Sequence, residues 1–275
     1  MTTLRIDPHV HSEASHDGTE PVELLLEQAA DIGLDAVVVT DHDVIHESLR
    51  AAELAPEYGL VGIPGVEVST AHGHLLAIGV EEMPPHREPI GRTAEWIRDR
   101  GGVAIVPHPF QRSRHGVRKR HLAGVDVDAV EVYNSWFLTG YNNRRANRFA
   151  EERGFPGVAS SDAHKVEYVG RAYTEIDLRG TARESVTGEE ILAAIRDGST
   201  RIEGRRTPIG VSSRHYVMAG TKKSAYYAKV GAKRGGHVAW LGAKIGSHAA
   251  VKGLRSGTSA ARTGVRLSAR LLSGL

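Results

Sequence analysis

Short apolar runs alternate with segments of helical spacing over roughly the first 200 residues of the chain. The run 35–40, for example, follows a segment in which Val22, Leu25, Leu26 and Ala29 share one helical face. Regular alternation of this kind favours a mainly parallel sheet with helices outside it, and runs that are apolar on both faces suit buried parallel strands. Seven or eight such units fit a small α/β barrel better than an open sheet.

Turn and capping residues divide this pattern into elements. We expect strands at residues 4–7, 35–40, 60–70, 72–80, 103–109, 127–134, 157–164 and 170–177. We expect helices at residues 19–32, 45–58, 89–100, 142–153 and 187–197. Thr19 is the expected cap of the first helix, with Pro21 in its first turn.

Metal-capable side chains recur where these strands end. His9 and His11 follow the first strand, and Asp162 and His164 follow the seventh. Asp41, His42 and Asp43 follow the second strand, and His108 follows the run at 104–107. Glu67 lies at the end of the third strand, His74 near the start of the next, and Glu131 and Asn134 at the end of the strand at 127–134. In parallel α/β folds, active sites form at this rim of the sheet.

The spacing and the donor types indicate metal binding. Residues two apart in extended chain point the same way, so His9 and His11 can face one ion, as can Asp162 and His164. The chain has no cysteine, and imidazole with carboxylate suits Zn²⁺, Mn²⁺ or Fe²⁺. The donors exceed one coordination sphere, so we expect more than one metal, with a carboxylate such as Glu67 bridging two.

Each motif alone also has an ordinary explanation. A His-x-His pair is often two surface histidines, Asp43 can cap a helix, and His108 can be a turn residue before Pro109. Five strand ends that all carry histidine or acid favour a shared site instead. We expect the histidines without such placement at the surface: His16, His46, His72, His86, His115 and His121.

Six motifs occur in a fixed order along residues 4–203: "DPHVHSEASHDG", "VVTDHD", "PGVEVST", "VPHPF", "VEVYN" and "SSDAH". Together they resemble the PHP (polymerase and histidinol phosphatase) family of metal-dependent phosphoesterases. The resemblance covers about three quarters of the chain. It implies a distorted seven-stranded β/α barrel of the PHP type with a two- or three-metal site at its rim.

The resemblance also implies three groups of ligands for divalent Mn, Fe or Zn. The first is His9, His11, Glu67 and Asp162; the second is Glu67, His74 and His108; the third is Asp17, His42 and His164. Asp17 matches through Ser15-His16-Asp17-Gly18. The sequence departs from the family at Pro8, where relatives usually have an apolar residue such as Leu, and through the intervening His16, a competing donor.

The chemistry of such a site suits phosphoester hydrolysis. Metals neutralise phosphate oxygens and lower the pKa of bound water toward neutrality, so that a metal-bridging hydroxide attacks phosphorus in line. We expect Asp43 to serve the leaving oxygen as a proton donor. Arg112 and Arg171 are the candidates for gripping phosphate, with a solvated surface role as the alternative for each.

Charge separates the C-terminal part from the rest. Residues 204–275 contain 14 of the 35 Lys and Arg and no Asp or Glu, which leaves 21 Lys and Arg against 33 Asp and Glu in residues 1–203. The body therefore carries a net charge of −12 and the tail +14. We expect a PHP domain over 1–203 and a basic Gly/Ala/Ser-rich tail over 204–275, either disordered or partly helical. A tail of this charge is expected to bind a polyanion such as nucleic acid or an anionic surface.

The leading function is hydrolysis of a phosphoester: a small phosphomonoester, a nucleotide or an oligonucleotide end. The alternative is a nucleic-acid-associated accessory protein that binds through its tail and uses the barrel as a nuclease or metal-binding module. No apolar run reaches transmembrane length and the N-terminus is no signal peptide, so a cytoplasmic location is expected.

Overall fold

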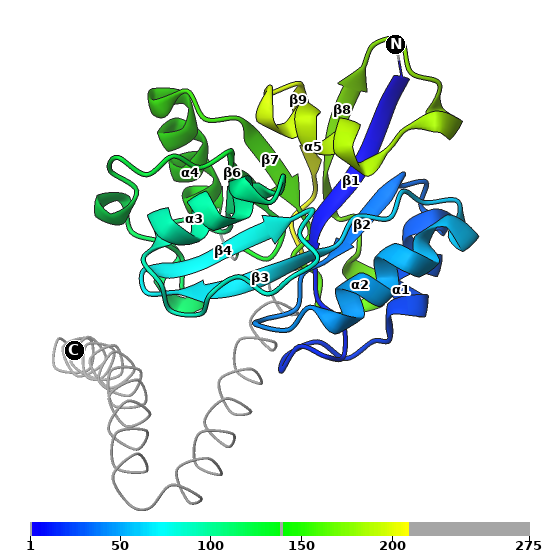
Figure 1. The fold of residues 1–275 in the computed structure, drawn as a ribbon, viewed down its shortest axis with the longest axis horizontal. Helices are drawn as coiled ribbons and strands as arrows, with labels where there is room; N and C mark the ends of the chain where they lie inside the picture. The colour runs from blue at the N-terminus through cyan, green and yellow to red at the C-terminus, as the bar shows by residue number, and fades with distance from the viewer. Residues whose placement is uncertain (1, 138–139, 209–275) are drawn as a thin grey trace, which may run out of the picture. The chain divides into compact units, whose positions relative to one another are not determined.

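A computed structural model of the chain describes residues 2–137 and 140–208 (Figure 1). Most of the expected basic tail lies outside the described residues. The described part forms nine strands: β1 (Thr2–Val10), β2 (Ala36–Val39), β3 (Gly65–Thr70), β4 (Gly73–Ile78), β5 (Val103–Val106), β6 (Ala129–Asn134), β7 (Gly157–Ser160), β8 (Ala172–Leu178) and β9 (Thr200–Gly204).

Five α-helices accompany these strands in the described part of the chain. They are α1 (Val22–Asp31), α2 (His46–Leu54), α3 (Ile90–Asp99), α4 (Gly140–Arg153) and α5 (Gly188–Arg196). Among the described residues, none of these helices combines the length and apolar character that crossing a lipid bilayer requires.

The strands form two open sheets, so the expected closed seven-stranded barrel is wrong for the structure. One sheet has the order β2-β1-β8-β9 and the other the order β3-β4-β5-β6-β7. The expectation of a mainly parallel sheet is also wrong, because only β1–β2, β5–β6 and β6–β7 pair in parallel. The reason lies in the connections: only two residues, Ala71 and His72, separate β3 from β4, which allows a hairpin and leaves no room for a crossover helix.

The two sheets meet at two isolated bridges. Val10, at the end of β1, bridges Ala163 after β7, and His42, after β2, bridges Glu67 of β3. Both contacts lie beside metal-capable side chains, so the sheets approach each other at the end of the molecule that carries them.

Three clusters of buried apolar side chains pack against the two sheets. Between the sheets, Leu4, Val38 and Ile105 pack with Ile191 and Ile195 of α5. Helices α3 and α4 cover the outer face of the five-stranded sheet, and α1 and α2 lie against β2 (Figure 1). The shared face Val22, Leu25, Leu26 and Ala29 is buried as expected.

Helix ends differ from the expectation at one point. Pro21 is the N-cap of α1, and the Thr19 hydroxyl lies instead within hydrogen-bond distance of two acceptors, Glu20 Oε1 at 3.0 Å and the His164 carbonyl at 3.3 Å. The expected start at Thr19 is therefore wrong: the N-cap is Pro21, in extended conformation, and the helix begins at Val22, three residues after Thr19. At α5, Thr187 and Glu190 form a reciprocal capping box.

Candidate metal centre

The nine candidate metal ligands lie together where β1, β2, β3, β5 and β7 approach one another. His9, His11, Glu67, Asp162 and His164 are fully buried. The other four are nearly buried: Asp17, His42, His74 and His108. Burial of this many ionisable groups in one place costs free energy unless they are paired or bind ions.

The first group has the spacing of ligands around one ion. His9 Nε2 lies 3.0 Å from His11 Nε2 and 3.4 Å from Glu67 Oε2. Asp162 Oδ1 lies 3.5 Å from His9 Nε2 and 3.4 Å from His11 Nε2. Ligands about 2.1 Å from a tetrahedral ion stand about 3.4 Å apart, so this donor set fits a divalent metal.

Glu67 connects the first group to the second. Its Oε2 faces the first group, whereas its Oε1 lies 2.7 Å from His74 Nδ1 and 2.9 Å from His108 Nε2. One carboxylate that directs each oxygen to a different set of imidazoles has the arrangement of a bridging ligand.

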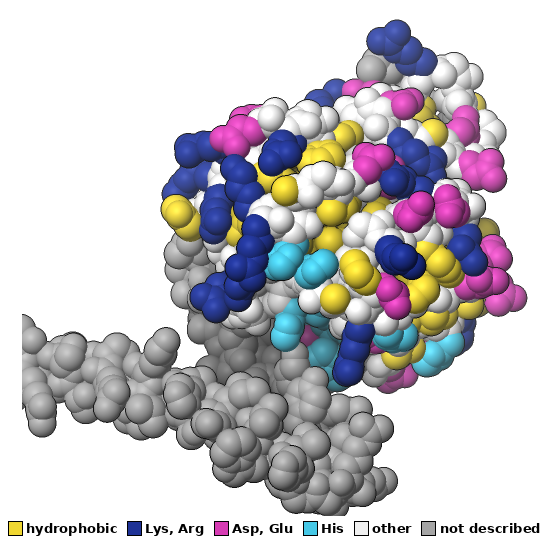
Figure 2. Space-filling view, turned by 60° about the vertical axis from the view of Figure 1, so that its left-hand side comes forward, with side chains coloured by type: hydrophobic (Ala, Val, Ile, Leu, Met, Phe, Trp, Pro, Cys, Tyr) yellow, Lys and Arg dark blue, Asp and Glu magenta, His cyan; other side chains and the backbone are white. Residues whose placement is uncertain are grey.

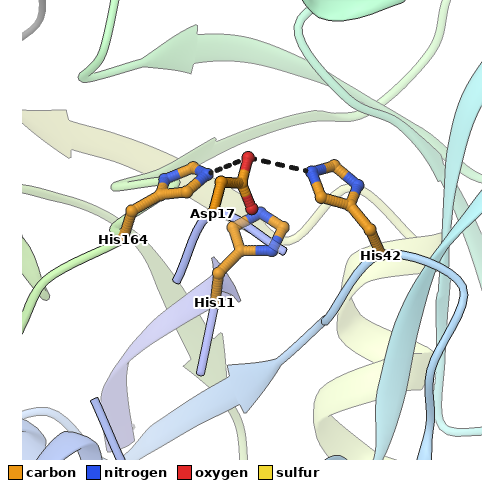
Figure 3. A group of neighbouring side chains, drawn as sticks. All are labelled: His11, Asp17, His42 and His164. Atoms are coloured by element: carbon orange, nitrogen blue, oxygen red, sulfur yellow. Dashed lines mark ion pairs between the residues drawn. The ribbon is translucent and has the colours of Figure 1, made fainter. Parts of the chain in front are cut away.

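The third group gathers around Asp17 (Figure 3). Asp17 Oδ2 lies 3.2 Å from His164 Nε2 and 3.5 Å from His42 Nε2. His11 also lies within reach of this group. The other ring nitrogen of His42, Nδ1, lies 3.0 Å from Glu67 Oε2, so this imidazole joins the third group to the first.

Outer polar residues hold the ligands in place. Glu131 Oε1 lies 3.1 Å from His9 Nδ1, and Glu131 Oε2 accepts a hydrogen bond from the backbone N–H of His108. Asn134 Nδ2 donates to both Glu131 and Asp162 at 2.8 Å. A carboxylate behind a metal-binding histidine sets the tautomer and orientation of its ring, so Glu131 can orient His9, and Asn134 can orient Asp162.

Asp7 ties the first strand to the loop that carries Asp162. Its Oδ1 accepts a hydrogen bond from Ser161 N and its Oδ2 accepts one from Gly170 N. Burial raises the pKa of Asp7 to about 6, although these bonds favour the charged form. Asp7 thereby connects both parts of the first ligand group.

When no cation is bound, the charges of the centre favour an ionised Glu67 facing a protonated His42, whereas burial lowers the pKa of His11 and of His74. Burial opposes ionisation of Glu67, but His42, His74 and His9 outweigh it and hold the pKa of Glu67 well below its usual range. Burial likewise opposes the charge on His42, yet Glu67 and Asp17 raise the pKa of His42 to about 10. In the absence of metal, His42 therefore holds a proton on its ring, and a metal that binds this imidazole must displace that proton.

Two ligands lie on strained backbone. His108 has φ 28° and Asp162 has φ 54°, in the left-handed region that non-glycine residues rarely adopt. Each is the second residue after its strand, β5 or β7. Strain of this kind concentrates at functional sites.

The three residues predicted for catalysis lie outside the ligand groups. Asp43 Oδ1 accepts a hydrogen bond from Ser69 N and lies 3.4 Å from His86 Nδ1. Arg112 is exposed on a short 3-10 helix. Arg171 donates from Nη2 to the carbonyl of Arg206.

Arg114, which the sequence did not single out, reaches the centre. Its Nη1 lies 2.5 Å from Asp162 Oδ2, and its Nη2 donates to Asp162 Oδ1 at 3.0 Å. Two histidines that were expected at the surface also border the ligands. The His115 ring stacks on that of His74 at 5.1 Å, and the His16 ring lies 4.8 Å from that of His42. None of the three follows a strand, so the strand-end pattern did not include them.

Two protein families match the sequence of this chain. The PHP domain family matches residues 7–122, and the family described as PHP-associated matches residues 140–200. The chain belongs to the PHP family. The two matches include all nine candidate ligands, and the His, Asp and Glu groups of this PHP protein are capable of holding metal ions.

Sequence relatives of this PHP protein include a shorter protein that matches over nearly its whole length. The uncharacterised protein MJ1587 of Methanocaldococcus jannaschii is 28% identical over 160 residues, which is 54% of this chain and 93% of the relative. The phosphoribosyl 1,2-cyclic phosphate 1,2-diphosphodiesterase of Eggerthella lenta is 39% identical over 85 residues, which is 29% of this chain and 32% of the relative.

Solved structures share the fold of this PHP protein. PsfC from Pseudomonas syringae PB-5123 superposes with a TM-score of 0.58 at 21% identity, over 82% of this chain and 100% of that chain. A protein from Bifidobacterium adolescentis, described as a candidate metal-dependent phosphoesterase, has a TM-score of 0.51 at 17% identity, over 70% of this chain and 96% of that chain. At these identities the similarity concerns the fold.

Proposed function

We propose that this PHP protein hydrolyses a phosphoester with two or three divalent metal ions, Mn, Fe or Zn, held by the nine candidate ligands. The observation that carries the proposal is the position of Glu67, whose two carboxylate oxygens face separate sets of imidazoles. Divalent ions bound there neutralise phosphate oxygens and lower the pKa of bound water toward neutrality.

The protein's own residues orient and enclose this chemistry. Glu131 and Asn134 fix His9, His108 and Asp162 by the hydrogen bonds described above. The complete burial of the first group excludes bulk water, which strengthens the attraction between its charges and a phosphate.

Among the arginines near the centre, we assign the phosphate grip to Arg114. Its guanidinium binds Asp162 through both Nη nitrogens, which places it beside the first ligand group, and its remaining N–H groups can donate to phosphate oxygens. Arg112 and Arg171, the residues proposed from the sequence, bind nothing in the ligand groups in the described part of the chain and are the alternatives.

Asp43 remains the proposed proton donor for the leaving oxygen. Its side chain is about one-third exposed, at 33%, so a substrate can reach it. The Asp43 backbone N–H donates to the Glu67 carbonyl at 3.0 Å, which places this residue next to the bridging ligand.

The substrate proposal extends to phosphodiesters as well as phosphomonoesters and nucleotides. Its support is the Eggerthella lenta relative, which is named as a cyclic phosphate diphosphodiesterase and matches over 32% of its length. We also propose that residues 204–275 act as a basic tail that binds polyanions, and that the protein acts in the cytoplasm.

The test is a substrate screen of the metal-reconstituted full chain against phosphomonoesters, nucleoside bisphosphates, cyclic dinucleotides, and short RNA and DNA. Glu67→Gln should abolish hydrolysis and reduce the bound metal by at least one equivalent. Glu57→Gln, on an exposed surface position, is the matched control and should change neither. No hydrolysis of any of these substrates, or full activity of Glu67→Gln, would refute the proposal.

A further inference from the structure

Two segments that border the metal centre carry Lys and Arg without any acidic residue. Residues 101–125 and 132–150 together contain eight Lys and Arg and no Asp or Glu. The rest of residues 1–203 then has 13 Lys and Arg against 33 Asp and Glu. An acidic body with one cationic region has a field that draws polyanions to that region.

Side-chain contacts hold these two segments together as one surface. The rings of Phe110 and Phe149 pack edge to face with centroids 5.3 Å apart. Arg145 lies over the Phe110 ring at 4.5 Å, and Asn142 donates to Gln111. The loop after β5 is therefore packed on α4, and their cations share one side of the molecule.

The arginines of this surface are free to bind an outside anion. We call the basic rim the six exposed residues Arg112, Arg118, Arg120, Arg144, Arg145 and Arg148. Within residues 2–137 and 140–208, none of the six forms an ion pair with an acid, whereas arginines elsewhere, such as Arg50, Arg183 and Arg201, do. Figure 2 shows Lys and Arg side chains gathered along one flank, beside histidine side chains.

The basic rim runs directly into the metal centre. Arg114, between two rim residues in sequence, holds Asp162. The backbone carbonyl of His115 accepts a hydrogen bond from His74 N at 3.0 Å, and the two imidazoles stack. A chain of phosphates lying along the rim would thus reach the candidate ligands at one end.

One exposed aromatic side chain points to the class of polyanion. Tyr141, in the first turn of α4, is 62% exposed and stands in the same segment as Arg144 and Arg148. Cations that track a backbone, together with an aromatic ring for stacking, are the combination that binds single-stranded nucleic acid.

We propose that the basic rim and Tyr141 bind a single-stranded oligonucleotide and deliver its phosphates to the metal centre. The inference rests on the proposed function and specifies its substrate class. It concerns the body of the protein and not the basic tail.

The test compares binding by variants of the metal-loaded full chain. The probe is a labelled single-stranded phosphorothioate oligonucleotide of about 12 nucleotides, which resists hydrolysis and spans the usual site sizes. The rim variant is Arg144→Gln with Arg148→Gln. The control, Arg5→Gln with Arg179→Gln, removes the same charge near the N-terminal half of β1 and after β8, away from the rim. The tail is the same in all proteins.

The rim variant should bind about tenfold more weakly, and the slope of log affinity against log salt should become shallower by about 1.4, because each lost phosphate contact contributes about 0.7. The control should stay within about twofold of the unaltered protein. Equal affinities of the rim and control variants would overturn the proposal.

Tyr141→Ala separates nucleic acid from other linear polyanions. It should weaken oligonucleotide binding several-fold and leave the binding of inorganic polyphosphate unchanged. No loss for the oligonucleotide would overturn the assignment to nucleic acid. The rim variant should keep full activity on a small phosphomonoester. If the unaltered protein hydrolyses none of the substrates, the proposed function is refuted. The binding measurements would still show whether the basic rim binds the oligonucleotide.

Discussion

The guanidinium of Arg114 binds both carboxylate oxygens of Asp162, with Nη1 2.5 Å from Oδ2 and Nη2 3.0 Å from Oδ1. Asp162 is at the same time within 3.5 Å of His9 Nε2, inside the first ligand group. Arg114 holds the pKa of Asp162 well below its usual range against the opposing effect of burial. A cation from the protein thus lies against a carboxylate that also faces the metal position.

Removal of this guanidinium should weaken substrate binding. We expect Arg114→Ala to raise KM for a small phosphomonoester at least about tenfold, because a phosphate loses a bidentate partner. Arg114→Lys should recover only part of this, since an ammonium cannot form the fork. Arg112→Ala, in the same 3-10 helix but exposed, is the control; a larger effect from Arg112→Ala would return the phosphate grip to the residue that the sequence suggested.

The Glu131 carboxylate should control metal affinity without touching the ions. Glu131→Gln keeps an oxygen near His9 and His108 but removes the negative charge that favours the correct imidazole tautomer. Metal affinity, measured by competition with a chelator, should fall about 10- to 100-fold. Unchanged metal affinity would contradict this prediction. Thermal unfolding of the metal-free variant would then show whether Glu131 serves the stability of the fold instead.

Metal uptake should depend on pH with a definite sign. The folded-state pKa of His42 is raised to about 10, so in the metal-free protein this imidazole is charged at neutral pH and must lose its proton to bind a metal. Affinity should therefore rise with pH between about 6 and 8, by about tenfold per unit for each proton displaced. Calorimetry in buffers of different ionisation enthalpy would count the protons, and a count of zero would contradict the prediction.

The same shift affects stability in the metal-free protein. A pKa raised above the unfolded value of 6.5 stabilises the fold below that pH, and the stabilisation is lost as the pH rises through about 10. Chelator-treated protein should accordingly lose thermal stability from neutral to alkaline pH, and metal-loaded protein should lose less.

The capping box of α5 offers a prediction remote from the metal centre. Thr187→Ala removes the side-chain oxygen that accepts from Glu190 N and should lower the free energy of unfolding by about 1 kcal/mol. Thr187→Ser keeps this oxygen and should remain close to the unaltered protein. Denaturant unfolding measures both, and equal losses would show that the methyl group and not the cap matters.

The basic tail should be dispensable for hydrolysis of small phosphoesters. β9 extends to Gly204, and Thr207 is buried with its N–H donating to the Ser135 carbonyl, so the truncation should end after Pro208. This variant should keep kcat/KM for a small substrate within a few-fold and lose affinity for polyanions at low salt. Equal affinity of the full chain and the truncated chain for a polyanion at low salt would contradict the prediction.

The strand-end pattern predicted most of the centre but little of what supports it. His9, His11, Glu67 and Asp162 were found from the sequence because two-residue spacing and chain order specify a rim. Arg114 reaches Asp162 from a 3-10 helix that has no periodic signal, so only the structure reveals it.

The topology was harder to predict than the elements, for a related reason. Apolar runs show where strands lie, but a run that pairs in parallel looks the same as one that pairs in a hairpin, as β3 and β4 do. β9 was missed because four of its five residues are exposed and carry no apolar alternation. Pairing partners depend on contacts between distant segments, which local patterns do not contain.

The division into two sheets gives the metal centre a mechanical role. His9, His11 and His42 belong to the sheet built on β1, while Glu67, His108 and Asp162 belong to the one built on β3 to β7. At the end of the molecule that carries the ligands, isolated bridges at Val10–Ala163 and His42–Glu67 join the backbones of the two sheets. Metal ions held by ligands from both sheets would fasten the two sheets together. Removal of bound metal by a chelator should therefore speed the exchange of amide protons near Val10–Ala163 and His42–Glu67 before the interior packed around α5 opens.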